Sequence, residues 1–342
     1  LKQPLWRGRG RAIGEASILA ARVTRTQNEH TRDRVSSETL RDVLTAYWEL
    51  WYADAAVLIQ QQAREVAARQ RDEADARARS GSLAPAEVLT FDTQVATSDQ
   101  DVLNASVDRA ARVHELERLV GGGTLSFDVL GDEPPASGGY ARQSIEERAV
   151  SDATEVREKL SALALARLQQ KTADDPKKPQ LDLDTFVQTQ GIGLESYADS
   201  ASQFVSGDVI SGFMGLTFSA PVNTRVQRAE AAKARLATEV AEEQLRETKQ
   251  RVLSQVRGAL DKEAAGAQKV ELAERTVGIA ERQLSAEQAR YQSGSSTSIA
   301  VLEAQNAVRS AKLRLARARA DWSESALVLD HLSGDLLARY AR

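Results

Sequence analysis

Side chains that commonly carry chemistry are few in this chain and are not grouped. The 342-residue sequence has no cysteine, which excludes disulfides, thiolate metal sites and cysteine nucleophiles. The histidines His30, His114 and His331 are isolated and are expected on the surface, so no metal site and no nucleophile–base pair is predicted. The segment GGGT at residues 121–124 lacks the Gly-Lys-Ser/Thr sequence that completes a phosphate loop. We therefore predict a protein that is not an enzyme and has no catalytic residue, cofactor or metal.

A cluster of arginines near the N-terminus is a second candidate. The segment RGRGR at residues 7–11 could suggest RNA binding. It follows a short strand-like segment and precedes a helix-like one, however, and we interpret it as the rim of a barrel. The net charge of −4, with both signs mixed along the chain, implies no polyelectrolyte partner. No nucleic-acid binding is predicted.

The elements that would position any site belong to an internal repeat. An offset of 213 residues aligns ARARSGS (76–82) with ARYQSGS (289–295). With no gap, the ending Leu-x-x-Leu-x-Gly at residues 116–121 then falls on the same pattern at residues 329–334. Shared helical composition alone would not usually keep both turns and both endings in step. We therefore divide the chain into two repeats, residues 1–139 and residues 140–342.

Both repeats are predicted to contain a long helical hairpin. In the first repeat we expect the end of a strand, a long helix at 12–79, a tip at 80–84, a return helix at 85–119 and a loop at 121–139. In the second we expect a helix at 143–171, a β-hairpin at 179–222, a long helix at 225–291, a tip at 292–297 and a return helix at 298–332. Apolar residues recur along the return helices at alternating spacings of three and four, a heptad pattern typical of coiled coils. Arg109 and Arg112 are exceptions, because they occupy seam positions of the first repeat.

Two segments between the hairpins change to a period of two. Apolar residues alternate with polar, small or threonine residues at Leu181, Leu183, Val187, Met214, Leu216 and Phe218. Two amphipathic strands of about ten residues fit an outer-membrane β-hairpin with this apolar side toward lipid. They also fit a half-buried hairpin of a soluble sheet, which is the interpretation that the strand patterns by themselves favour. Pro4 corresponds to Pro221, which predicts that the first repeat also begins on a strand and that a further strand precedes Leu1.

Taken in order, these features resemble the TolC-like outer membrane efflux protein family. The resemblance is carried by the duplicated hairpin, by IAVLEAQNAV (299–308) and PAEVLTFDTQV (85–95) after the turns, by the strand exits QPLWRG (3–8) and GLTFSAPV (215–222), and by HLSG (331–334). It covers nearly the whole chain and implies a mainly α fold with a small β part. Duplicated antiparallel coiled-coil hairpins would form an α-barrel tunnel through the periplasm, below a trimeric 12-stranded β-barrel in the outer membrane.

The resemblance also implies a function and partners. The chain would be the passive exit duct of a tripartite efflux pump or of a type I secretion system. It would assemble as a homotrimer in outer-membrane lipid and contact a periplasmic adaptor (membrane fusion) protein and an inner-membrane transporter. The transported substrate is not specified by any residue pattern.

Residues of the pore entrance can be carried over from the family only position by position. Tyr291 stands at the gate tyrosine and Glu303 at the second acidic position, whereas Ala300 and Ser296 replace the first acidic and the basic residue. Glu87 is the remaining acid in the first repeat. Glu87 and Glu303 also suit the first turn of a helix, and Tyr291 also suits a seam, so both readings remain open. The resemblance assigns adaptor contact to the tips, at Gly81, Ser82, Gly294 and Ser295.

Two other classes of protein fit parts of the sequence. A periplasmic adaptor also contains a coiled-coil hairpin, but such chains usually have one hairpin within a β-rich fold. A soluble coiled-coil scaffold with an added β-hairpin would need no membrane at all. If the strands do not face lipid, the chain should stay soluble without detergent, whereas an outer-membrane duct should need detergent to stay in solution.

Overall fold

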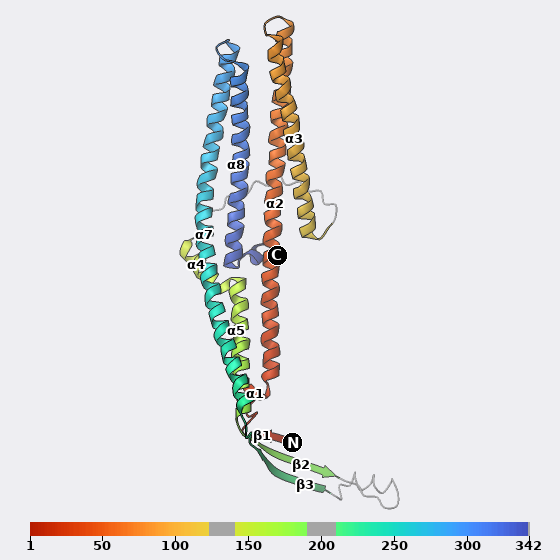
Figure 1. Cartoon of the computed structure of the whole chain (residues 1–342), viewed down its shortest axis with the longest axis vertical. Helices are drawn as coiled ribbons and strands as arrows, with labels where there is room; N and C mark the ends of the chain where they lie inside the picture. Colours follow the sequence, from red (N-terminus) through yellow and green to blue (C-terminus); the bar gives the residue numbers. More distant parts are fainter. Residues whose placement is uncertain (123–140, 190–209, 341–342) are drawn as a thin grey trace, which may run out of the picture. The chain divides into compact units, whose positions relative to one another are not determined.

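The computed structural model describes residues 1–122, 141–189 and 210–340 and is mainly helical with one small sheet (Figure 1). The chain divides into two compact units, unit 1 with Leu1–Arg32 and Glu155–Lys249, and unit 2 with Asp33–Thr154 and Gln250–Arg342. The long helices α2 (Ala16–Arg79) and α7 (Arg225–Gln292) contribute to both units. Each unit combines residues from both predicted repeats, because the units are defined by spatial contact. The division of the sequence into two repeats therefore stays a prediction.

Unit 1 contains an antiparallel sheet in the order β1-β2-β3, formed by Lys2–Pro4, Gln180–Thr189 and Ile210–Ser219. In the β2–β3 register, Leu181 lies opposite Phe218 and Leu183 lies opposite Leu216. Directly opposed residues of an antiparallel pair project from the same face of the sheet. The apolar residues Leu181, Leu183, Leu216 and Phe218 therefore share one face, and Asp182, Asp184 and Thr217 share the other with Phe186 and Phe213.

The two turns between the long and the return helices have the same backbone hydrogen bonds. Helices α3 (Pro85–Val120) and α8 (Ser298–Ser333) follow the turns. Gly81 and Gly294 have left-handed φ angles of 77° and 75°, which glycine adopts without strain. The next N–H, that of Ser82 or Ser295, donates to the carbonyl five residues back at 2.9 Å in both turns. This hydrogen bond is the Schellman helix ending, so the sequence repeat extends to the atoms of the backbone.

A hydrophobic core in unit 2 joins the two hairpins. Trp48, Leu50 and Trp51 of α2 pack with residues of α3, α8 and the short helix α9 (Leu336–Tyr340). Complete burial of one such side chain contributes about 1.5–3 kcal/mol, so this core stabilises the contact between the hairpins. Its other members are Leu116, Ala316, Ala320, Leu327 and Leu336.

The arginines at seam positions of the first hairpin are paired. Arg109 donates to the carboxylate of Asp54 on α2, which is buried. Arg112 lies 3.6 Å from Glu49, also on α2. Removing one partner of a buried pair leaves the other charge without compensation, so these seam positions tolerate arginine only because α2 supplies acids.

Close packing in the second hairpin depends on a glycine. A Cβ at Gly266 of α7 would lie 2.8 Å from the indole of Trp322 on α8. The indole N–H donates to Glu263 at 3.4 Å. Trp322 can therefore occupy its heptad position because the facing helix has no side chain at residue 266.

The structure departs from the predicted elements in the connecting helices. The single helix expected at 143–171 is two helices, α4 (Arg142–Asp152) and α5 (Thr154–Ala173), separated by Ala153 with an extended ψ of 131°. The break directs the carbonyl of Asp152 against Gly334, where a Cβ would approach it to 2.6 Å. Helix α9 was not predicted, and α2 is preceded by the short helix α1 (Arg11–Gly14). Most of the predicted loop at 121–139 lies outside the described residues.

The expectation of surface histidines is wrong for His331 and only partly right for His30. His331 is buried and its Nδ1 is hydrogen-bonded to the hydroxyl of Ser37 at 2.8 Å. His30 is partly buried and is hydrogen-bonded to Ser161 at 2.8 Å. A serine on the facing helix is hydrogen-bonded to Nδ1 of each imidazole, a long-range pairing that spacing along the chain does not reveal. His114 is exposed, as expected.

Candidate functional site

The tips of the two hairpins meet through a contact that the sequence did not predict. Tyr291, in the last turn of α7, is partly buried, and the guanidinium of Arg77 on α2 lies 5.5 Å from the centre of its ring. Attraction of a cation to an aromatic face is worth about 0.5–1 kcal/mol at exposed sites and about 2 when desolvated. Arg77 precedes Gly81 by about one helical turn, as Tyr291 precedes Gly294. Arg77 and Tyr291 lie four and three residues before their tip glycines, so a place in the last turn before each tip is the signal that could have found Arg77.

Ser296 is used inside the second hairpin. Its hydroxyl donates to Glu287 on α7, which also lies 3.5 Å from Arg290. The residue at the family's basic position therefore contacts its own hairpin. Nearby, the backbone N–H of Ala300 donates to the hydroxyl of Thr297 at 3.3 Å, which caps the start of α8.

The two predicted acids of the entrance have different surroundings. Glu87 is partly buried in the first turn of α3, and Glu303 is exposed on α8. Neither has a hydrogen bond or an ion pair to another side chain within the described ranges. Tyr291 is thus the predicted gate residue that the structure brings against the other hairpin, and the gate role of the whole set stays a prediction.

Further from the tips, two arginines of α8 pair with acids of the first hairpin. Arg309 lies 2.5 Å from Asp101 on α3, and Arg317 lies 2.8 Å from Glu49 on α2. All four side chains are largely or half buried. Charge-assisted hydrogen bonds of this kind fix orientation as well as adding energy. With Arg77, they give three arginine-centred contacts between the hairpins.

An acidic cluster surrounds the contact made by Arg317. This arginine also pairs with Asp321 at 2.6 Å, and its guanidinium lies 5.3 Å from the ring centre of Tyr52. Glu324, one turn further along α8, has a buried carboxylate oxygen that no hydrogen bond satisfies. Burial, and then the negative charge of Glu49, raise the pKa of Glu324 from its usual 4.5 to about 7. A carboxylate that titrates near neutral pH therefore lies where the hairpins meet.

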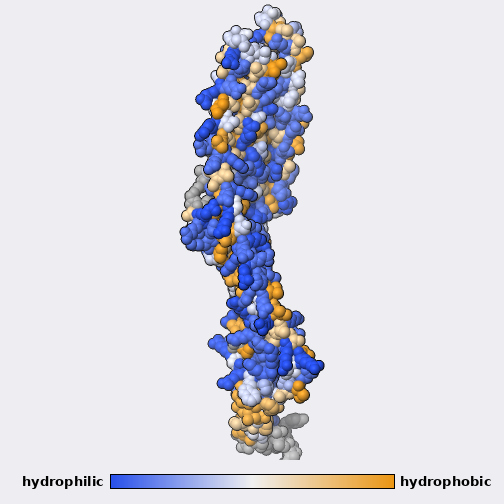
Figure 2. All heavy atoms as spheres, turned by 60° about the vertical axis from the view of Figure 1, so that its left-hand side comes forward, coloured by the Kyte–Doolittle hydropathy of each residue, from blue (hydrophilic) through white to orange (hydrophobic). Residues whose placement is uncertain are grey.

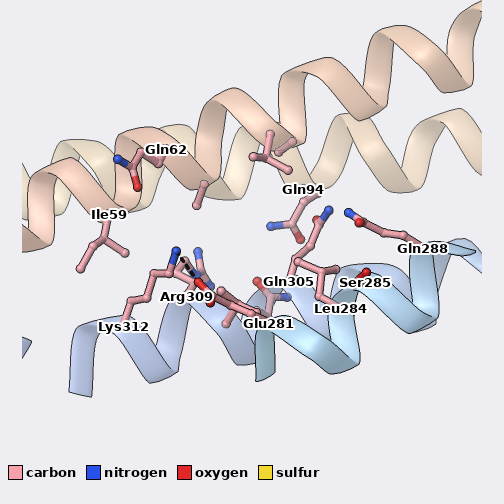
Figure 3. A pocket seen from close by; sticks show the side chains of 15 residues that line it. Ile59, Gln62, Gln94, Glu281, Leu284, Ser285, Gln288, Gln305, Arg309 and Lys312 are labelled. Atoms are coloured by element: carbon pink, nitrogen blue, oxygen red, sulfur yellow. Dashed lines mark ion pairs between the residues drawn. The ribbon is translucent and has the colours of Figure 1, made fainter. Parts of the chain in front are cut away.

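A cavity of about 290 Å³ lies between the two hairpins in unit 2 (Figure 3). Its lining is mainly amide and aliphatic, with Gln94 and Gln305 pointing into the space between the helices. Glu281 and Lys312, also in the lining, form an ion pair at 3.0 Å. Gln305 Nε2 is buried and has no hydrogen-bond partner. Such a lining can hold water or polar groups but offers no grouping for catalysis.

The sheet of unit 1 has two chemically different faces. The apolar face carries the large exposed side chains Met214, Leu216 and Phe218, with Val187 on β2, and Figure 2 shows hydrophobic residues gathered over the strands. Leu181 and Leu183 on the same face are partly buried.

The other face of the sheet carries two acids and Thr217, together with the exposed, stacked rings of Phe186 and Phe213, whose centres lie 5.3 Å apart. Lys2 pairs with buried Asp182 at 2.8 Å. Thr217 donates to Asp184 at 2.8 Å. The alternation expected for strands between lipid and an aqueous lumen is therefore present around Asp182 and Asp184, and Phe186 and Phe213 interrupt it further along the strands.

A family model described as outer membrane efflux protein matches residues 147–335. The chain belongs to the outer membrane efflux protein family. Membership agrees with the sequence resemblance and with the predicted location in the outer membrane. This is a family of efflux proteins and not a family of enzymes. A comparison with curated proteins found no match.

Solved structures of outer-membrane channels share the fold of this efflux protein. VceC from Vibrio cholerae is similar with a TM-score of 0.74 and 19% identity, over 94% of this chain and 75% of that one. OprN has a TM-score of 0.77 and 16% identity, over 95% and 72%. MtrE from Neisseria gonorrhoeae, in an open state, has a TM-score of 0.72 and 18% identity, over 95% and 72%. The predicted fold class, mainly α with duplicated hairpins and a small β part, is confirmed.

Two features are absent from the described part of this efflux protein. None of its described helices combines the length and the apolar character needed to cross a membrane. Within the same ranges, no three histidine, cysteine or acidic side chains are grouped so that they could hold a metal ion.

Proposed function

We propose that this efflux protein is a passive exit duct that spans the outer membrane and the periplasm as a homotrimer. It would serve a tripartite efflux pump or a type I secretion system, with a periplasmic adaptor and an inner-membrane transporter as partners. The transporter would supply the energy. The transported substrate is left open by the residues described above.

The two-faced sheet is the observation that carries this proposal. Strands β2 and β3 each have ten residues, which is the length of a tilted strand that crosses a bilayer. Leu181, Leu183, Val187, Met214, Leu216 and Phe218 would face lipid, and the acids of the other face would line the lumen. Three strands cannot close a barrel, and an open edge is not tolerated in lipid, so several copies must complete it.

Unpartnered apolar stripes on the helices support assembly of several copies. Leu89, Leu103 and Val107 on α3 are exposed, and so are Leu272 and Ile279 on α7. Other faces of α3 and α7 contact the neighbouring hairpin within one chain, through Asp101 and Tyr291, but these apolar side chains stay exposed. We propose that α3 of one copy packs against α7 of the next around a ring.

In a closed ring of hairpins the tips would form the periplasmic entrance. Tyr291, Ser296, Ala300, Glu303 and Glu87 would line it, with the Arg77–Tyr291 contact holding the two hairpins together. The exposed turns at Gly81, Ser82, Gly294 and Ser295 would meet the adaptor. Acidic side chains around such an entrance would favour cations.

Two neighbouring substitutions on β3 test the duct. Leu216→Lys places a charge on the apolar face, which costs about 2–4 kcal/mol near the middle of a bilayer. Thr217→Lys places the same charge on the face that carries the acids, opposite Asp182 in the register. We expect Leu216→Lys to abolish assembly in the outer-membrane fraction and Thr217→Lys to leave it near wild type. The proposed duct function would be contradicted if both variants assembled equally well. It would also be contradicted, in favour of a soluble scaffold, if the wild-type chain were a monodisperse monomer without detergent.

A further inference from the structure

The turn between β1 and α1 presents arginines in a fixed way. Gly8 has a left-handed φ of 81°, and its N–H donates to the buried carboxylate of Asp175 at 2.6 Å. The N–H of Arg7 donates to the carbonyl of Pro179 at 3.2 Å, which ties the turn to the segment before β2. The N–H of Arg9 donates to the carbonyl of Trp6 at 3.1 Å. These bonds hold the backbone while the side chains of Arg7 and Arg9 remain exposed.

A tryptophan lies between these arginines and the apolar face of the sheet. Trp6 is 50% exposed, and its ring meets that of Phe218 edge to face at 6.3 Å. Phe218 is the last apolar residue of β3 on the face that also carries Met214 and Leu216. Along this side of unit 1 the surface therefore passes from aliphatic to aromatic to cationic. This is the order of acyl chains, interface and headgroups in a bilayer.

The cations at this end of the sheet exceed the acids available to them. Lys177 and Lys178 pair with Asp174 and Asp175 at 2.5 and 3.0 Å. Arg7, Arg9, Arg225 and Arg228 are exposed, and no ion pair joins them to a carboxylate in the described part of the chain. Arg7 and Arg225 follow the ends of β1 and β3, which lie at the same end of the sheet because the strands are paired in register.

We propose that Trp6, Arg7 and Arg9, with Arg225 and Arg228, form a binding surface for the headgroups of anionic phospholipids. Guanidinium groups bind phosphate oxygens through paired N–H donors, and each basic residue near an anionic leaflet contributes about 1 kcal/mol. Trp6 would lie at the boundary between headgroups and acyl chains. The surface selects anionic over zwitterionic lipid because its arginines are not neutralised by the protein. This inference rests on the proposed function, since it requires the sheet to lie in a membrane.

A lipid competition experiment tests the surface directly. The detergent-purified protein is mixed with equal amounts of phosphatidylglycerol and phosphatidylcholine, and the lipids retained are counted by native mass spectrometry. We expect the wild type to retain phosphatidylglycerol preferentially. The double variant Arg7→Gln/Arg9→Gln should lose about thirty-fold in that preference, the equivalent of two basic residues. The control Arg22→Gln/Arg157→Gln removes two exposed arginines elsewhere in unit 1 and should keep it.

Every result of this experiment bears on the inference. The proposed lipid-binding surface would be overturned if the wild type showed no preference for phosphatidylglycerol. It would also be overturned if the Arg7/Arg9 variant kept that preference, or if the control variant lost it to the same extent. If the Arg7/Arg9 variant does not fold, the wild-type preference is measured at rising salt, where a fall supports the surface and no change overturns it. Failure of the proposed function is a separate result, namely a wild-type chain that needs no detergent to stay in solution.

Discussion

At the scale of single residues, the contact between the hairpins combines fixed charges with one group that titrates near neutral pH. Arg317 faces Glu49 and Asp321 and balances them with Arg112. Glu324 is added to this cluster without a hydrogen-bond partner for its buried oxygen. Because burial, and then the negative charge of Glu49, disfavour the carboxylate, the neutral form of Glu324 is the one that the fold favours.

The pKa of Glu324 has a consequence for stability. A pKa raised from 4.5 to about 7 means that the folded protein keeps a proton that the unfolded chain has lost between these values. The free energy of unfolding therefore falls as pH rises through this window. The Glu324→Gln variant cannot ionise, so its melting temperature should change less between about pH 5 and about pH 8 than that of the wild type. Near pH 8 the variant should be more stable by about 1–2 kcal/mol, allowing for partial exposure of the carboxyl.

Thermal melts of the detergent-purified protein at the two pH values measure this difference. Glu303→Gln is the matched control, since Glu303 is an exposed glutamate of the same helix. Its pH dependence should equal that of the wild type. If Glu324→Gln and Glu303→Gln melt with the same pH dependence, burial of Glu324 among the acids does not govern stability in this range.

At the scale of elements, the sequence predicts regular structure where a local rule determines it. The hairpins follow from heptad spacing, and the strand faces follow from a period of two. Each helix ending at Gly81, Gly121, Gly294 or Gly334 follows from the need for a residue with positive φ. The break at Ala153 does not follow from a local rule, and it lies where the carbonyl of Asp152 approaches the distant residue Gly334. The Arg77–Tyr291 contact was missed for the same reason, since it joins residues more than two hundred positions apart.

The contact between hairpin tips makes a prediction that depends on ring chemistry. If Arg77 holds Tyr291 by its aromatic face, Tyr291→Phe should behave as the wild type, whereas Tyr291→Leu and Arg77→Gln should weaken closure. The loss of about 0.5–1 kcal/mol would shift the opening equilibrium about two- to fivefold. Single-channel conductance in planar lipid bilayers would record longer or larger openings in these two variants.

Arg69→Gln supplies the control for this prediction, because Arg69 is an exposed arginine two turns earlier on α2. It should conduct as the wild type does. A Tyr291→Phe variant that opens like Tyr291→Leu would instead assign closure to the tyrosine hydroxyl. Unchanged conductance in all the variants would remove this contact from the gate.

At the scale of the whole molecule, the two exposed stripes have matching heights. Leu103 lies 18 residues from the start of α3, about 27 Å from the tip, and Leu272 lies 20 residues from the end of α7, about 30 Å from its tip. Both side chains are more than half exposed, at 64% and 57%. Packing α3 of one copy against α7 of the next would bring them close together and bury both. A single chain offers no described partner for either stripe, so the ring would supply their burial.

The absence of cysteine from the sequence makes this arrangement testable by cross-linking. In a Leu103→Cys/Leu272→Cys variant, mild oxidation should give bands of two and three linked chains on a non-reducing gel, because a disulfide forms only when the Cα atoms approach within about 7 Å. Each single variant lacks its partner and should give no three-chain band. Asn104→Cys with Leu272→Cys moves one thiol about 100° around α3, away from the stripe, and should link far less. Equal linking of both pairs, or none with Leu103→Cys, would exclude contact between α3 and α7 at this height and require a different order of helices around the tunnel.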